Sequence, residues 1–205
     1  MSAAVKTRAK VLDPRQFGRV LEEVSQWAKN PARDRVIFLL SFKAGLRVAE
    51  IAGMTWRDVT DAEGNIIAPP GNYDVPADIA KKGSGRTIPM HPDLYKALVA
   101  LAAQDWPLLS PKQRLKVHIV RDTSGRPMRA NTLQRYISRA YEKIGFNGCS
   151  SHSGRRTFIT TLAQAAGAHD CSLRDVQMLA GHRGIDTTEA YIVASDRVGQ
   201  LVRSV

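Results

Sequence analysis

The chain has 205 residues, 43% of them hydrophobic, which is enough to bury a core and form one domain with short extensions. Its longest apolar run covers seven residues, 97–103, whereas a helix that spans a bilayer needs roughly 20. The N-terminal residues lack the apolar stretch of a secretion signal. We therefore expect a cytoplasmic protein without a membrane-spanning segment. The formal net charge of +11 favours a polyanionic partner over a small acidic substrate.

Two further compositional features narrow the function. Cys149 and Cys171 are too few and too irregularly spaced for a disulfide framework or a zinc site, so we expect two reduced thiols. Residues 112–143 hold nine basic and two acidic residues. A solvated charged face would explain such a segment in an average protein, but in a chain this basic it favours a surface for a phosphate backbone.

The chain begins with a basic segment and a predicted helix. We expect residues 1–12 to form a flexible arm, because the segment contains Lys6, Arg8 and Lys10 and no acidic residue. Asp13 and Pro14 predict a helix start, with an N-cap followed by proline at the first helical position. Apolar residues then recur at helical spacing as far as the Asn30-Pro31 pair, namely Phe17, Val20, Leu21, Val24 and Trp27.

A second helix is predicted over residues 32–43, and Gly45 is expected to end it. Arg47 then falls in a buried turn just beyond the helix. Between residues 55 and 90, Gly, Pro and Asn separate short segments such as 56–59 and 86–90. This punctuation predicts short strands of a small antiparallel sheet, with residues 81–86 as a hairpin turn.

Helical patterns return after residue 90. Apolar spacing predicts helices around residues 94–101 and 133–144, and further helices from about 153 to 166 and from 173 to 180. Gly167 and Gly181 are the expected C-terminal stops. Apolar residues at helical spacing in 195–205 indicate a tail that packs on its own domain or on a neighbouring protomer. The predicted fold class is mainly α with a small antiparallel β-sheet (α+β).

The chain also carries a set of side chains suited to phosphodiester chemistry. A tyrosine phenol such as Tyr191, nine residues after His182, becomes a nucleophile when nearby cations stabilise the phenolate. Arg47 and Arg155 can each bind non-bridging phosphate oxygens through two N–H groups. A histidine exchanges protons near neutral pH, and a lysine in a turn can protonate a departing 5′ oxygen. Each residue alone would more often be structural, but the set supplies every group that metal-free strand cleavage needs.

Four segments, in this order, resemble the sequence boxes of the tyrosine recombinase (phage integrase) family. The segment AGLRVAEI at 44–51, followed by WRDV at 56–59, is similar to the first arginine box of the family. SHSGRRTF at 151–158 resembles the second arginine box, LAGH at 179–182 the histidine box, and TTEAY at 187–191 the nucleophile box. The resemblance covers residues 13–194, which we expect to form the catalytic domain, and implies the fold of that domain.

The resemblance implies a role for each matching residue. Tyr191 would attack the scissile phosphate, forming a 3′-phosphotyrosyl link and releasing a 5′ hydroxyl. Arg47 and Arg155 would clamp the phosphate, His152 would accept and return a proton, and His182 would donate a hydrogen bond to a phosphate oxygen. Glu50 would orient Arg47. The hairpin lysine of the family maps to Lys81 without a gap, counted back from Arg86, and to Lys82 with one gap.

The resemblance also implies a substrate and partners. The expected function is site-specific recombination or integration of double-stranded DNA, by a homotetramer on the DNA and without a metal, ATP or another cofactor. The helix over 133–144 would lie along the major groove, with expected DNA contacts from Arg129, Arg135, Arg139 and Lys143. Family members usually carry a separate N-terminal helical domain, so another domain or an accessory protein would complete the clamp around DNA.

Two positions depart from the family pattern, and other functions stay open. Gly154 replaces a common aliphatic residue and Arg156 a frequent histidine, but neither change removes a required group. A topoisomerase of type IB would use the same tyrosyl chemistry. A metal-dependent nuclease would use Asp186, Glu189 and Asp196, although Asp186 is more simply explained as a helix N-cap. A catalytically inert DNA-binding regulator or accessory module of the same fold is the alternative from a different functional class.

Overall fold

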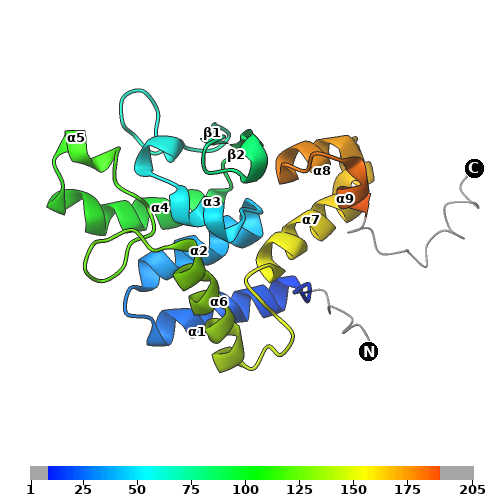
Figure 1. The fold of residues 1–205 in the computed structure, drawn as a ribbon, viewed down its shortest axis with the longest axis horizontal. Helices are drawn as coiled ribbons and strands as arrows, with labels where there is room; N and C mark the ends of the chain where they lie inside the picture. Colours follow the sequence, from blue (N-terminus) through cyan, green and yellow to red (C-terminus); the bar gives the residue numbers. More distant parts are fainter. Residues whose placement is uncertain (1–8, 190–205) are drawn as a thin grey trace, which may run out of the picture.

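The computed structural model describes residues 9–189 and leaves Tyr191 and the tail 195–205 outside the described residues. Helices and one hairpin build the described part of the chain (Figure 1). The α-helices are α1 (Pro14–Trp27), α2 (Pro31–Lys43), α3 (Val48–Gly53), α4 (Pro92–Asp105), α5 (Pro111–Arg114), α6 (Ala130–Ile144), α7 (Ser153–Ala165), α8 (Leu173–Ala180) and α9 (Ile185–Glu189). The strands are β1 (Asn72–Val75) and β2 (Arg86–Pro89), and the short 3₁₀ helices are η1 (Trp56–Val59), η2 (Lys81–Gly83), η3 (Trp106–Leu108) and η4 (Ala166–His169).

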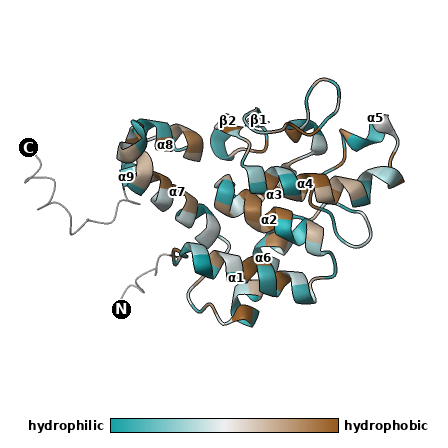
Figure 2. Ribbon diagram, turned by 180° about the vertical axis from the view of Figure 1, so that it is seen from behind, coloured by the Kyte–Doolittle hydropathy of each residue, from teal (hydrophilic) through white to brown (hydrophobic). Residues whose placement is uncertain are grey.

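Helix α2 lies at the centre of the main hydrophobic core. Residues 36–40 are fully buried, and the helix packs against α1, α4 and α7. Figure 2 shows hydrophobic residues in brown along α2, which agrees with this central position. Leu94, Leu98 and Leu101 of α4 are fully buried against the same core. The predicted helices of this region are therefore confirmed.

The start of α1 is confirmed in detail. The Asp13 carboxylate accepts a hydrogen bond from the Gln16 N–H at 2.8 Å, and Pro14 occupies the first turn. The described end of the basic N-terminal segment is attached to the domain. The N–H of Lys10 donates to the Gly148 carbonyl at 3.2 Å, and the N–H of Leu12 donates to the Thr157 hydroxyl at 3.0 Å.

The small antiparallel sheet exists, but one of its expected strands does not. β1 pairs with β2 in the register Tyr73 opposite Ile88, and both side chains are buried. The prediction of a strand over residues 56–59 was wrong, because this segment is the 3₁₀ helix η1. The Asp58 carboxylate accepts from the N–H of Thr55 at 2.7 Å and thereby stabilises a helical turn.

The C-terminal helices α7, α8 and α9 stand beside the main body, with α8 against β2 (Figure 1). A small cluster made by Ile159, Ala166, Val176 and Ala180 holds α7 and α8 together. Gly181 ends α8 at φ +62°, as predicted. Gly167 does not end α7, because it lies inside η4, and Asp170 at φ +52° follows that helix.

Several smaller expectations can be compared with residues 9–189. Cys149 and Cys171 are both free thiols. No helix in the described part of the chain is long and apolar enough to cross a membrane. No group of at least three His, Cys, Asp or Glu side chains there is placed to hold a metal ion. Asp186 is not the N-cap of a helix but lies inside the first turn of α9.

Candidate active site

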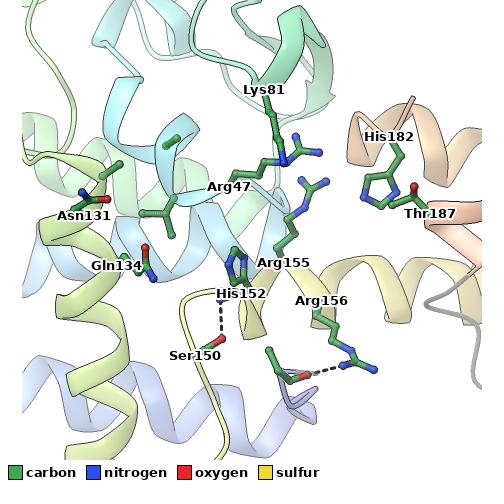
Figure 3. A pocket seen from close by; sticks show the side chains of 14 residues that line it. Arg47, Lys81, Asn131, Gln134, Ser150, His152, Arg155, Arg156, His182 and Thr187 are labelled. Atoms are coloured by element: carbon green, nitrogen blue, oxygen red, sulfur yellow. Dashed lines mark hydrogen bonds between the residues drawn. The ribbon is translucent and has the colours of Figure 1, made fainter. Parts of the chain in front are cut away.

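A cavity of about 810 Å³ opens where the N-terminal ends of α3, α6 and α7 meet the β1–β2 connection and the segment after α8 (Figure 3). It brings together Arg47, Lys81, His152, Arg155 and His182, which are far apart in the sequence. Its remaining lining residues are Ala9, Val48, Ala49, Ala130, Asn131, Gln134, Ser150, Arg156 and Thr187. Tyr191, the predicted nucleophile, is outside the described residues.

Arg47 precedes α3 and is fixed by Glu50 of the same box. Its guanidinium donates to Glu50 at 2.7 Å, and its backbone N–H donates to the other oxygen of the same carboxylate at 2.8 Å. A second guanidinium N–H donates to the Gly181 carbonyl at 3.2 Å. Burial alone would raise the pKa of Glu50, but hydrogen bonds and positive charge from Arg86, together with Arg47, lower it. Glu50 is therefore a carboxylate that orients Arg47.

Arg155 lies in the first turn of α7 and is itself buried. Its guanidinium donates to the Gly45 carbonyl and the Ala180 carbonyl, both at 2.5 Å. Gly45 is needed at this point because its φ is +62° and because a Cβ there would collide with the Phe158 ring. The glycine of the first arginine box thus allows the second box to pack closely against it.

His182 follows the C-terminal end of α8 and points into the cavity (Figure 3). Its Nδ1 atom lies 3.0 Å from the Thr188 hydroxyl, and its carbonyl accepts from the Gln177 side chain at 2.9 Å. Burial lowers the pKa of His182 to about 4, with further contributions from Arg155, Arg47 and Arg86. The imidazole is therefore neutral at pH 7, which suits a hydrogen-bond donor better than a general acid.

His152 occupies the N-terminal end of α7 and is exposed to solvent. Its backbone N–H donates to the Ser150 hydroxyl at 3.3 Å. Arg156, one of the two departures from the family pattern, also lines the cavity and donates to the Ala9 carbonyl at 2.9 Å. Gly154, the other departure, allows close packing, because a Cβ there would lie 2.8 Å from the Phe42 ring and collide with Ser41.

The two candidate lysines differ in position. Lys81 lines the cavity, whereas Lys82 is not among the lining residues. Lys82 adopts φ +59°, and its carbonyl accepts a hydrogen bond from Arg183 at 2.6 Å. The short helix η2 therefore directs the two neighbouring side chains differently, and this geometry favours Lys81.

The face of α6 that lines the cavity differs from the predicted basic face. Asn131 and Gln134 lie on the cavity wall (Figure 3), and the sequence interpretation did not select either of them. Their spacing of three residues just after the helix start could have identified them as neighbours on one helical face. The predicted contacts Arg129, Arg135, Arg139 and Lys143 are exposed but do not line the cavity. Lys143 lies over the Trp27 ring, 4.3 Å from its centroid, and so faces α1.

The side chains around this cavity are suited to an anionic ligand. Arg47, Arg155, Arg156 and Lys81 are cationic, and the neutral ring of His182 can donate one hydrogen bond. Guanidinium groups match the paired oxygens of a phosphodiester and neutralise negative charge that develops on them. The arrangement can therefore bind a phosphodiester and stabilise nucleophilic attack on its phosphorus.

Comparisons with known proteins identify the family of the chain. The sequence profile of the phage integrase family matches residues 10–197. Tyrosine recombinase XerC of Nitrobacter winogradskyi is 28% identical over 175 residues, which cover 84% of this chain and 50% of the relative. Tyrosine recombinase XerD of Shewanella oneidensis is 28% identical over 200 residues, which cover 93% of this chain and 59% of the relative. The chain thus spans between half and three fifths of the length of these relatives.

Solved structures show the same fold. The crystal structure of XerA recombinase superposes with a TM-score of 0.70 at 20% identity, covering 95% of this chain and 64% of that protein. The Tn1549 transposon integrase in complex with circular intermediate DNA superposes with a TM-score of 0.72 at 19% identity, covering 95% and 66%. The predicted α+β class and the fold of the tyrosine recombinase catalytic domain are confirmed. Since the family profile spans nearly the whole chain, the protein belongs to the phage integrase family.

Proposed function

We propose that this chain is the catalytic part of a site-specific DNA recombinase or integrase that cleaves and rejoins strands through a 3′-phosphotyrosyl intermediate. The observation that carries the proposal is the convergence of Arg47, Lys81, His152, Arg155 and His182 on one cavity. Thr187 lines the same cavity and lies four residues before Tyr191 in the chain. The cation-rich cavity is thus close in sequence to a tyrosine that can act as nucleophile.

The reaction needs one nucleophile, one leaving group and two proton transfers. The Tyr191 oxygen bonds to phosphorus as its proton passes to His152, and the bond from phosphorus to the 5′ oxygen breaks. Lys81 gives a proton to that oxygen, which leaves as a hydroxyl. Arg47 and Arg155 neutralise the charge on the non-bridging oxygens. Attack by a 5′ hydroxyl from another strand reverses these steps, so ATP is not consumed.

The substrate proposed for the whole assembly is double-stranded DNA, bound by a homotetramer. Several related solved structures are described as DNA complexes, including a lambda integrase dimer bound to a core site and XerH bound to its difH substrate. The relatives are longer than this chain, which agrees with a proposed additional DNA-binding half from another domain or an accessory protein. The polar face of α6 would lie along the DNA next to the scissile phosphate.

A nicked DNA substrate tests the proposal. Because the strand is nicked close to the scissile phosphate, the short fragment with the 5′ hydroxyl dissociates after cleavage. Religation is then impossible, and the covalent intermediate accumulates. DNA carrying the target site comes from selection on a randomised library with the catalytically silent variant Tyr191→Phe. We expect the wild-type chain to form an adduct that withstands denaturation and EDTA, and Tyr191→Phe to bind the same DNA without forming it.

The alternatives give other outcomes in the same assay. A chain that binds the selected DNA and forms no adduct would be an inert regulator, and the proposal would be wrong. Cleavage that EDTA abolishes would indicate a metal-dependent nuclease. A topoisomerase would relax supercoiled DNA but would not exchange strands between two duplexes that both carry the selected site, so no recombinant product would form.

A further inference from the structure

The structure contains a buried arginine, Arg86, that is close to the site but does not line the cavity. It begins β2, and its side chain is 5% exposed. Two of its N–H groups donate to the two oxygens of Glu50, at 3.1 and 2.9 Å, and Nε donates to the Leu179 carbonyl at 2.7 Å. All three of these bonds cross between separate elements: β2, α3 and α8.

These contacts form part of a pattern at the C-terminal end of α8. The successive carbonyls of residues 179, 180 and 181 accept hydrogen bonds from Arg86, Arg155 and Arg47, respectively. The carbonyl end of a helix carries partial negative charge, which the guanidinium groups complement. His182 follows directly. The position of the histidine relative to the two phosphate-binding arginines is therefore set by where these carbonyls are held.

Arg86 also shares its carboxylate partner with Arg47. Each of the two Glu50 oxygens accepts from both residues, and the carboxylate is fully buried. Without Arg86, Glu50 would lose partners in a place that water does not reach, and Arg47 would be held on one side only. Gly181 leaves room for the Arg86 side chain, because a Cβ at this position would lie 3.0 Å from an Arg86 nitrogen.

We propose that Arg86 is a positioning residue for the phosphate-binding clamp, acting through Glu50 on Arg47 and through the Leu179 carbonyl on His182. This inference rests on the proposed function. It assigns to the reaction a residue, Arg86, that does not itself contact DNA. Misplacement of catalytic groups by about 1 Å can slow a reaction about 10²-fold. The effect of losing Arg86 should therefore be on the chemical step and not on DNA affinity.

The test uses Arg86→Lys, which keeps the buried positive charge but cannot form the fork between Glu50 and Leu179. The rate of adduct formation is measured at saturating nicked DNA, beside the dissociation constant for intact DNA. We expect the rate to fall about 10²-fold and the dissociation constant to stay close to that of the wild type. Circular dichroism and thermal unfolding establish that the variant is folded.

Arg33→Lys is the matched control. Arg33 is also a buried arginine that bridges a buried carboxylate, Asp34 at 2.6 Å, and a backbone carbonyl, that of Arg121 at 2.9 Å. It is not among the residues that line the cavity. We expect both Arg33→Lys and Arg86→Lys to lower the unfolding temperature, because each weakens a buried arginine–carboxylate network. In Arg33→Lys, however, the rate of adduct formation at saturating DNA should stay at the wild-type level.

Arg86 could also influence Lys81 through β2. A chemically altered substrate distinguishes an effect on the phosphate-binding clamp from an effect on Lys81. A sulfur in place of the bridging 5′ oxygen leaves without needing a proton. If Arg86 acts on the clamp, Arg86→Lys stays slow on this substrate relative to wild type. Full recovery on the sulfur substrate would assign Arg86 to the lysine turn and would overturn the inference.

Other results also decide the question. An Arg86→Lys variant that forms the adduct at the wild-type rate, or that loses only DNA affinity, contradicts the inference while the proposed function stands. If Arg86→Lys does not fold, Glu50→Gln tests the same link from its other end. It should slow cleavage at saturating DNA, and an unchanged rate would refute the positioning role. Failure of the wild-type chain to form any adduct refutes the proposed function instead, and the inference falls with it.

Discussion

The Nδ1 atom of His182 and the hydroxyl oxygen of Thr188 lie 3.0 Å apart, and Thr188 is fully buried. A neutral imidazole has one N–H donor and one acceptor nitrogen. When the Thr188 hydroxyl donates to Nδ1, the ring proton resides on Nε2, the other ring nitrogen. The pair thus links His182, which lies beside Arg47 and Arg155, to the sequence box that contains Tyr191.

We predict that Thr188→Val slows adduct formation about 10²-fold, because the variant leaves Nδ1 without its donor and the ring proton no longer stays on Nε2. The rate at saturating nicked DNA measures the effect. Thr188→Ser keeps the hydroxyl and should retain most of the activity. Equal rates for the Val and Ser variants would show that the hydroxyl has no role in orienting His182.

The lowered pKa of His182, about 4 against an ordinary 6.5, makes stability depend on pH. Between these values the unfolded chain binds a proton that the folded chain does not, so stability falls as the pH falls from 6.5 towards 4. Urea unfolding at pH 7 and pH 5.5 should show this loss, and His182→Gln should reduce it. The pKa of His91 is also lowered, by burial and by Lys43, so His91 should cause part of the pH-dependent loss of stability that remains in His182→Gln. An unchanged pH dependence in His182→Gln would contradict the prediction.

A change of the leaving group in the substrate can distinguish the roles of the two lysines of the β1–β2 connection. We predict that Lys81→Ala slows cleavage of a normal phosphodiester by about 10²- to 10⁴-fold and that a bridging 5′ sulfur restores the rate. Lys82→Asn is the control, because asparagine tolerates the positive φ of +59° found there. Sulfur rescue of the Lys82 variant in place of the Lys81 variant would reverse the assignment.

Two exposed residues of α6 should affect DNA binding differently. An amide side chain such as Gln134, on the cavity wall, can read an adenine edge, so Gln134→Ala should relax base preference at one position by about 1–3 kcal/mol. Arg139 is exposed away from the cavity, and Arg139→Ala should weaken all sequences alike and lower the salt dependence by about one counterion. Selection from randomised DNA and salt titrations measure the two effects. A uniform loss for Gln134→Ala would exclude base reading.

Gly154 should be essential for packing of α7 on α2. We predict that Gly154→Ala destabilises the domain by about 1–3 kcal/mol, because the added methyl group would meet Ser41 and the Phe42 ring. Gly18→Ala provides the contrast, since a methyl group added to Gly18, within α1, would meet no atom within 4 Å beyond its own helix backbone. That change should stabilise the domain by about 1 kcal/mol. Chemical denaturation compares the two, and equal effects would contradict the packing argument.

Local signals explain which parts of the fold could be predicted. Asp13 and Pro14 indicate a helix start in adjacent residues, and the segment 32–43 before Gly45 is longer than the roughly four to eight residues of a typical strand. Residues 56–59 are short and apolar enough for either a strand or a 3₁₀ turn, and the Thr55–Asp58 hydrogen bond decides between them. Gly167 resembled a stop because glycine favours positive φ, yet Asp170 adopts that conformation here.

The candidate site was predictable where a residue type indicates a chemistry. Arg47, His152, Arg155 and His182 were selected from the sequence, and all of them line the cavity. Asn131 and Gln134 were missed because amides on a helix surface are ordinary until the opposite wall is known. Arg86 was used only to count back to the lysine, since its partners lie 36 and 93 positions away in the chain. Such contacts depend on tertiary structure and leave no local pattern.

The shared carboxylate of Glu50 has an electrostatic consequence. Arg47, Arg86 and Arg155 contribute three positive charges, Glu50 contributes one negative charge, and the His182 ring is neutral. This group of side chains therefore holds a surplus of two positive charges, to which Lys81 and Arg156 on the cavity wall add two more. The surplus is self-repelling until an anion enters. Binding of DNA should therefore raise the free energy of unfolding of the domain.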